Sequence, residues 1–187
     1  MLAYLQGLSL GLAYVAPIGV QNLFVINAGL SQPRAAAYRT ALIVIFFDVT
    51  LALAGFFGIG ALIEHSELIR KGVLLAGSLV VMYMGLRLML SREVAGPAIN
   101  VNIPLMKTIG MACVVTWFNP QALIDGTMML GAFRASLPAG TDLFFICGFA
   151  SASVLWFLGI STVISLLGAR FNEKVLNIIN KVCGVVI

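Results

Sequence analysis

The chain has 187 residues, of which 61% are hydrophobic and only 10% are charged. A soluble domain is about half apolar and about a quarter charged, because charged side chains keep its surface in water. This composition excludes a water-soluble globule and predicts a protein that is largely covered by lipid. The net charge of +4 comes from basic residues spread over the polar connections, which argues against nucleic-acid binding.

The length accommodates about six transmembrane helices, at about 20 residues per span and about 1.5 Å of rise per residue. Helices are expected because lipid offers the backbone no hydrogen-bond partners. We therefore predict an all-α, polytopic membrane bundle that forms a single transmembrane domain over residues 1–187, with no separate soluble domain. The N-terminus lacks the basic region of a cleavable signal peptide, so the first apolar segment is interpreted as a retained span.

Six apolar segments follow one another along the chain. They cover about 2–30, 41–63, 72–90, 108–133, 143–167 and 175–187. A polar, proline-containing loop separates two halves of three spans each, about 1–92 and 105–187. Since each half has an odd number of spans, the second is expected to be inverted relative to the first. The last segment is too short to cross about 30 Å of hydrocarbon, so we expect a truncated sixth helix.

Basic residues in the connections predict the orientation of the chain. Seven lie in connections one–two, three–four and five–six, and three lie in the other two connections. They are Arg34, Arg39, Arg87, Arg92, Lys107, Arg170 and Lys174, against Arg70, Lys71 and Arg134. Cytoplasmic loops are enriched in Lys and Arg, so the first set is expected in the cytoplasm and the N-terminus outside.

Two carboxylates lie within apolar segments, Asp48 in the second and Asp125 in the fourth. A charged residue at the centre of a bilayer costs at least about 2.5–3.5 kcal/mol, so such residues usually face the bundle interior and serve a function. Counted from the segment starts, the two carboxylates would lie in opposite halves of the membrane, about 15 Å apart in depth. A structural hydrogen bond between helices is the alternative role for each, and for Asp125 it has equal weight.

Two proline sites are expected to break or kink the first and fourth spans, because proline lacks an N–H and clashes with the preceding turn. Amide side chains accompany both sites. The residues are Pro17, Gly19, Gln21 and Asn22 in the first span, and Asn119, Pro120 and Gln121 in the fourth. Broken helices at corresponding places in two halves are a pointer to a transporter site, where freed N–H groups can hold an anionic group. Ordinary proline kinks are the alternative.

Small residues and cysteines complete the pattern. Gly7 and Gly11 in the first span, and Gly148 and Ala152 in the fifth, have the spacing that allows close helix packing, although glycine is also simply frequent in membrane helices. Ser151 and Ser153 are expected to form hydrogen bonds between helices. Four aromatic residues could line a path, although packing and lipid-facing roles are more common; they are Trp117, Phe118, Trp156 and Phe157. The three cysteines, Cys113, Cys147 and Cys183, form no CxxC pair and are expected to be buried free thiols. We expect no cofactor and no metal site.

At these residues the sequence resembles the LysE-type amino-acid exporters, in particular the lysine and arginine exporters. The resemblance extends in the family's order over nearly the whole chain. It is found in 17–29, in Asp48 with 54–58, in 116–125, in 152–157 and in 178–184. The family usually has proline where Val20 stands, which would soften the break here, and its chains are somewhat longer.

The resemblance implies a secondary exporter of amino acids in the cytoplasmic membrane, driven by protons or the membrane potential rather than by ATP. An enzyme is not expected, because the sequence shows no metal cluster, nucleophile–base pair or phosphate loop. The resemblance also implies that Asp48 and Asp125 match important intramembrane carboxylates, and that the substrate is a basic amino acid. The expected partners are this substrate, protons as coupling ion and the lipid bilayer, with a homodimer as a candidate assembly. An intramembrane redox carrier and a passive channel remain as alternatives. The redox carrier is disfavoured because the first span has no cysteine.

Overall fold

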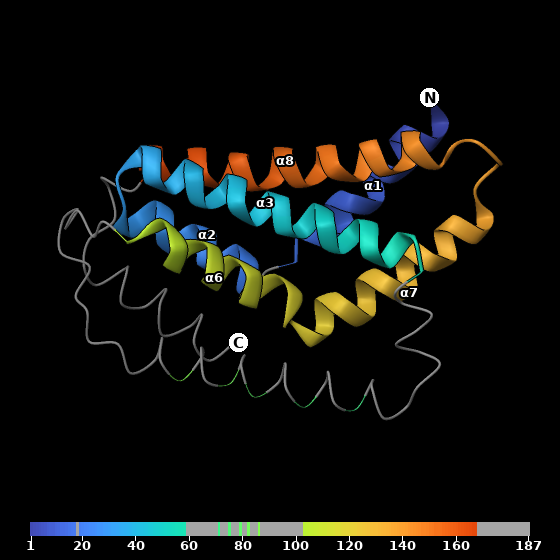
Figure 1. Ribbon diagram of the computed structural model, residues 1–187. Coiled ribbons are helices and arrows are strands. Elements are labelled where there is room, and N and C mark those ends of the chain that lie inside the picture. The colour runs from blue at the N-terminus through green and yellow to red at the C-terminus, as the bar shows by residue number, and fades with distance from the viewer. Residues whose placement is uncertain are drawn as a thin grey trace.

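The computed structural model describes residues 1–17, 19–58, 71, 75, 79, 82, 86 and 103–167 (Figure 1). The described ranges form six helices of three or more turns. They are α1 (Leu2–Val15), α2 (Val20–Ser31), α3 (Arg34–Phe56), α6 (Leu105–Trp117), α7 (Pro120–Ser136) and α8 (Asp142–Leu167). In α7 the side chains at 120, 121, 124, 125, 127, 128, 132 and 135 are not described. The prediction of an all-α chain is confirmed for these ranges.

Two of the described helices, α3 and α8, are long and apolar enough to cross a membrane individually. A third candidate span is the pair α1 and α2, whose axes differ by 75° across a short break. The predicted second and fifth spans are thus present as apolar helices, and the predicted break in the first span is confirmed. Helix α3 begins at Arg34, seven residues before the predicted segment, since Pro33 precedes a run of alanines that favours helix.

The fourth predicted segment is divided into α6 and α7, which meet at an angle at Phe118–Asn119 (Figure 1). Helix α6 has 13 residues and is a shorter apolar helix. The third and sixth predicted segments, 72–90 and 175–187, lie outside the described residues apart from four isolated positions of the third. Six spans in two inverted halves therefore stay a prediction.

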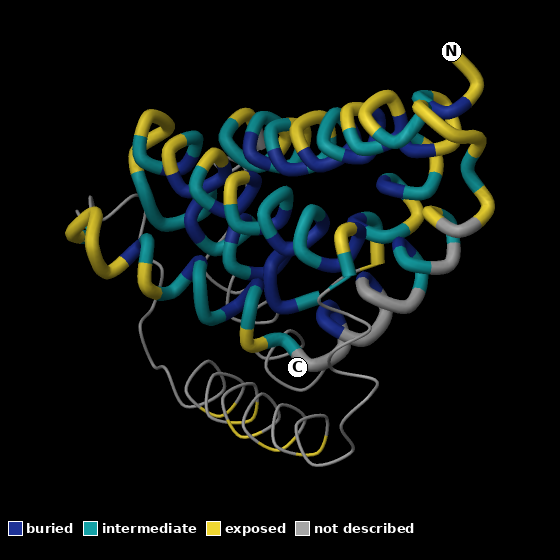
Figure 2. The backbone as a smooth tube through the Cα atoms, turned by 45° about the vertical axis from the view of Figure 1, so that its right-hand side comes forward, coloured by how far each residue is buried: buried dark blue, intermediate teal, exposed yellow. Residues whose placement is uncertain are grey.

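Helix α8 packs against three elements of the first half, namely α1, α2 and α3 (Figure 1). It runs antiparallel to α3. Buried residues line the inner faces of these helices, while exposed residues lie on their outer faces (Figure 2). The outer faces carry large apolar side chains such as Phe46 and Leu155. Because such side chains are suited to lipid, the described helices have the arrangement of a membrane bundle, with polar residues such as Asp48 and Asn22 buried between them.

The predicted small-residue motifs of the first and fifth spans pack on each other. A Cβ atom at Gly7 would collide with the backbone of Phe145, and a Cβ at Gly148 would collide with the backbone of Tyr4. A Cβ at Gly11 would also be too close to α8. Glycine is therefore required here by the close approach of two backbones, which is the way small residues act in membrane helix pairs. The contact holds α1 firmly against α8.

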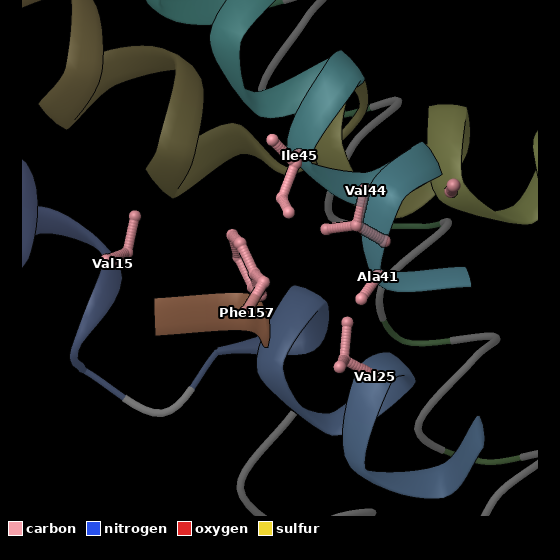
Figure 3. Packing of buried hydrophobic residues seen from close by; sticks show 7 residues of the cluster. Val15, Val25, Ala41, Val44, Ile45 and Phe157 are labelled. Carbon is pink, nitrogen blue, oxygen red and sulfur yellow. The ribbon is translucent and has the colours of Figure 1, made fainter. Parts of the chain in front are cut away.

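Two apolar layers fill the interior on either side of Asp48. The Phe157 layer consists of Val15, Val25, Ala41, Val44, Ile45, Ala112 and Phe157 (Figure 3). The Phe56 layer consists of Ala3, Ala52, Phe56, Leu130, Phe145 and Phe149. Along α3, the first layer precedes Asp48 and the second follows it. Along the antiparallel α8 the order is reversed, so that Ser153 lies between the same two layers.

Candidate functional site

Asp48 lies in the middle of α3 and is only 1% exposed. One carboxylate oxygen accepts a hydrogen bond of 3.4 Å from Gln21 Nε2 on α2, and the other accepts a short one from Ser153 Oγ on α8. The side chain thus faces the bundle interior, as predicted from the cost of a carboxylate in lipid. The consecutive helices α2 and α3 and the distant helix α8 thus meet at this one side chain.

The donors that the described residues place on Asp48 are an amide and a hydroxyl, both of them neutral. Such donors satisfy the lone pairs of a carboxylate but do not compensate its charge. The described part of the site can therefore accept a cation or a proton at Asp48. This is the chemical property that sets the site apart from the surrounding apolar layers.

The break between α1 and α2 is held by the side chain of Asn22, which is buried. Its Nδ2 donates to the carbonyl oxygens of Val15 (2.9 Å) and Pro17 (2.7 Å), at the end of α1. Its Oδ1 accepts a hydrogen bond of 2.9 Å from Trp156 Nε1. The last carbonyls of a helix have no partner within it. Asn22 supplies that partner, and this explains why an amide lies beside the proline.

The start of α2 is formed by backbone alone. Gly19 occupies the N-cap position in extended conformation, with no side chain capping the helix. Pro17 lies within the break and is exposed. The first N–H groups of a helix lack intrahelical acceptors and carry a partial positive charge. The break therefore places backbone donors one turn or less from Gln21, whose side chain reaches Asp48.

The second break has a different local cause from the first. Asn119 Oδ1 accepts a hydrogen bond of 3.4 Å from the backbone N–H of Ala122, and Pro120 is the first residue of α7. An asparagine cap followed by proline is a favourable helix start, since that proline needs no donor. The prediction of an interruption at 119–121 is thus confirmed, with proline beginning a new helix rather than bending an existing one.

A side chain of α1 joins the two breaks, and a side chain of α6 joins the second break to α3. Tyr14, one residue before the end of α1, donates from its hydroxyl to the carbonyl of Ala122 at 3.0 Å. Trp117, the last residue of α6, donates from its indole to Thr50 Oγ1 at 3.3 Å. Thr50 is two residues from Asp48 on α3. Both interruptions therefore lie at the level of the buried carboxylate.

Of the predicted site residues, Asp48, Gln21 and Asn22 are brought together, with Gly19 and Pro17 forming the break beside them. The side chains of Asp125, Pro120 and Gln121 are not described, and the placement of Asp125 relative to Asp48 stays a prediction. Three further contributors were not singled out from the sequence as parts of the site: Tyr14, Ser153 and Trp156. Ser153 and Trp156 are three residues apart and share a face of α8, which is the one signal that connects them.

The cysteines differ from the prediction in one respect. Cys113 and Cys147 are free thiols, as expected. Cys113 is half-buried, but Cys147 is exposed on α8, so the expectation that it is buried was wrong. An apolar segment in lipid has apolar residues on its outer face as well, and hydrophobicity around a residue therefore does not predict its burial. Cys183 lies outside the described residues.

Known proteins resemble this chain over most of its length. The arginine exporter protein ArgO of Escherichia coli (strain K12) is 32% identical, with 98% of this chain and 88% of that protein covered. The ArgO proteins of Shigella flexneri and of Salmonella schwarzengrund (strain CVM19633) match with the same identity and coverage. No solved structure matches. The model of the family described as LysE type translocator matches residues 12–187, and the chain therefore belongs to the LysE type translocator family.

Proposed function

We propose that this protein is a secondary transporter that exports amino acids, with arginine and lysine as the preferred substrates, from the cytoplasm across the cell membrane. Membership of the translocator family supports the general activity. The basic substrate is supported by relatives named as arginine exporters at 32% identity. One observation in the structure carries the proposal: Asp48, deep inside the bundle, has only neutral donors among the described residues.

Asp48 is assigned the role of binding the positive charge of the substrate. Burying a carboxylate without a cationic partner costs free energy. A guanidinium or ammonium group would reduce that cost by donating hydrogen bonds to both carboxylate oxygens. Gln21 and Ser153 would then hold the carboxylate in place. The N–H groups at the start of α2 would receive the α-carboxylate of the amino acid, as backbone donors do in broken transporter helices.

Asp125 and the second break are assigned to the same pathway. Residues Asn119, Pro120 and Gln121 would provide a second set of backbone groups in the half formed by 105–187, opposite the half formed by 1–92. Asp125 would take up the substrate cation or a proton nearer the other membrane face. Export would be driven by the proton gradient or the membrane potential through protons that move inward in exchange for the substrate. An inside-negative potential opposes the exit of a lone cation, but it supplies about 2.3 kcal/mol for each positive charge that moves inward across 100 mV.

Transport by purified protein in proteoliposomes tests this function. Vesicles loaded with labelled arginine should release it on addition of external arginine or lysine, but not of leucine. Asp48→Asn retains the size and one acceptor oxygen of the side chain, but it replaces the other oxygen with an NH2 donor and removes the charge. We expect it to lower the exchange rate by about tenfold or more, the effect of losing about 1.4 kcal/mol. An unchanged rate in Asp48→Asn would exclude Asp48 as the cation site.

Asp142 offers a matched control for the same chemical change. It is a carboxylate in the first turn of α8, distant from the breaks and only partly buried. Asp142→Asn removes one negative charge from the protein, as Asp48→Asn does, but leaves the interior unchanged. We expect exchange within about twofold of the natural protein, because exposed charges contribute little.

We also propose that the end of the bundle at which α3 begins faces the cytoplasm, which leaves the N-terminus outside. Arg34 and Arg39 lie at that end, whereas Arg134 contacts the carbonyl of Phe56 at the other end of α3. A cysteine placed at exposed Arg34 should be labelled by an impermeant thiol reagent in inside-out vesicles and not in intact cells. Labelling in intact cells would reverse the assignment.

A further inference from the structure

One ridge of α8 carries three serines and one phenylalanine in successive turns. Ser153, Phe157, Ser161 and Ser165 follow one another at intervals of four residues, about 6 Å apart along the helix axis. Ser153 donates to Asp48. Phe157 therefore lies one turn beyond the carboxylate, toward the end of the bundle where α3 begins. Ser161 and Ser165 lie beyond Phe157 in the same direction.

Phe157 closes the interior at this level. Its side chain is fully buried and packs with Val25 of α2 and with Val44 and Ile45 of α3 (Figure 3). Val25 is four residues after Gln21, and Val44 is four residues before Asp48. Val25, Val44 and Phe157 thus lie one helical turn from Gln21, Asp48 and Ser153, respectively. All three lie on the side of Asp48 at which α3 begins. Among the described residues, a water or ion that moves between these side chains requires Phe157 or its neighbours to rearrange.

The two serines beyond Phe157 are unusual because of their hydrogen bonding. Ser161 is 0% exposed, and neither its Oγ nor the buried Oγ of Ser165 has a hydrogen-bond partner in the described part of the chain. Other hydroxyls of α8 bond to the carbonyl four residues earlier, as Thr162 does with Leu158 and Ser151 with Cys147. A buried hydroxyl without a partner costs free energy, and such groups call for a ligand or water to satisfy them.

We propose that Phe157 is the gate that separates Asp48 from the membrane face at which α3 begins, and that Ser161 and Ser165 line the substrate path beyond this gate. The inference rests on the proposed function and extends it to residues that have no assigned role. Hydroxyl oxygens accept hydrogen bonds from guanidinium and ammonium groups, so the serines suit a basic amino acid. The ring of Phe157 also offers its face to a passing cation.

Thiol accessibility measures the gate without requiring transport. The three cysteines of the chain are replaced by alanine, and single cysteines are then placed at four positions, namely Arg34, Ser153, Leu155 and Ser161. A cationic, impermeant methanethiosulfonate reagent is applied to vesicles of either orientation. The side that labels Arg34→Cys marks the face at which α3 begins, so the test does not depend on the assigned orientation.

The expected pattern has two parts. From the marked side, Ser161→Cys should react about tenfold faster than Leu155→Cys, a lipid-facing control that is 61% exposed on the outer face of the same helix. Ser153→Cys should react slowly from the marked side in the natural background. Adding Phe157→Ala should raise its rate from that side by about tenfold, which corresponds to about 1.4 kcal/mol of lost closure.

Phe149→Ala is the matched control for cavity formation. Phe149 is a buried phenylalanine four residues on the other side of Ser153, in the Phe56 layer. Its replacement removes the same apolar volume but should not increase labelling of Ser153→Cys from the marked side. Should Phe157→Ala fail to accumulate in the membrane, Phe157→Val, which retains a smaller side chain, replaces it with the same expected direction.

Two results would overturn the gate. The first is an equal increase in the labelling rate of Ser153→Cys from the marked side in the Phe157→Ala and Phe149→Ala variants. The other is a reaction of Ser161→Cys no faster than that of Leu155→Cys. The proposed function is tested separately, by measuring arginine exchange by the natural chain. Absent exchange together with the expected labelling would refute the function and leave the gate, whereas normal exchange with labelling insensitive to Phe157 would refute the gate alone.

Discussion

Asn22 links the break of the first span to α8 through three hydrogen bonds. Its Nδ2 holds two carbonyls of the α1 end, and its Oδ1 is held by the indole of Trp156. The preceding residue, Gln21, points to Asp48. The position of Gln21 therefore depends on Trp156, although these two side chains belong to different polar contacts. Trp156 is a positioning residue in this arrangement, since the described contacts place it on Asn22 and not on the carboxylate.

We predict that Trp156→Phe leaves Asn22 Oδ1 unsatisfied, lowers the free energy of unfolding by about 1–3 kcal/mol, and also lowers the arginine exchange rate. Tyr38→Phe is the matched control, because the hydroxyl of Tyr38 on α3 forms a hydrogen bond of 2.9 Å with Thr162 on α8, the helix that also carries Trp156. It should reduce stability similarly while exchange is retained. Thermal unfolding in detergent and vesicle exchange measure the two effects, and equal loss of exchange in both variants would argue against a positioning role.

At the scale of elements, the contact between α1 and α8 depends on glycine at positions where two backbones meet. Gly148 lies against the backbone of Tyr4, whereas Gly159, on the same helix, has nothing within 4 Å of an added Cβ. The same substitution therefore has opposite expected effects at two sites of one helix. Helical propensity favours alanine over glycine by about 1 kcal/mol at both positions. The two substitutions therefore differ only in the packing around the added Cβ.

Gly148→Ala should separate α1 from α8 and lower the free energy of unfolding by about 1–3 kcal/mol or more, as overpacking of a well-filled interior does. Gly159→Ala should leave stability unchanged or raise it by up to about 1 kcal/mol. The midpoints of thermal unfolding in one detergent decide between them. A midpoint for Gly148→Ala at or above that of the natural protein would mean that the two backbones are not in close contact in the membrane.

At the scale of the whole molecule, a substrate that binds the folded chain must also stabilise it. At arginine concentrations about 100 times the dissociation constant, the expected gain is about 2.7 kcal/mol. Asp48→Asn should abolish this gain, whereas the natural protein should show none with leucine at equal ionic strength. Differential scanning fluorimetry in detergent measures it, and an equal shift for Asp48→Asn would place the substrate away from Asp48.

The sequence predicted the features that depend on a single residue type in lipid. Asp48 was expected to face inward because of its charge, and the prolines at 17 and 120 marked the two interruptions. The sequence did not show that Pro120 begins a new helix after an asparagine cap. The 75° bend and the partners of Asp48 were not predictable. Lipid is as apolar as leucine, so hydrophobic patterning does not specify which helices associate. That α8 supplies Ser153 and Trp156 is a result of packing, and so is the exposure of Cys147.

The close pairing of α1 with α8 has a consequence for biogenesis. Gly7 and Gly148 are separated by about 140 residues, and a ribosome adds about 5–20 residues per second, so the glycine face of α1 waits on the order of 10 s for its partner. During that interval the glycine face of α1 can pack against any other helix in the membrane that carries small residues. Insertion and final assembly are therefore separate events for this protein. The carboxylate of Asp48 acquires its serine donor only at the second.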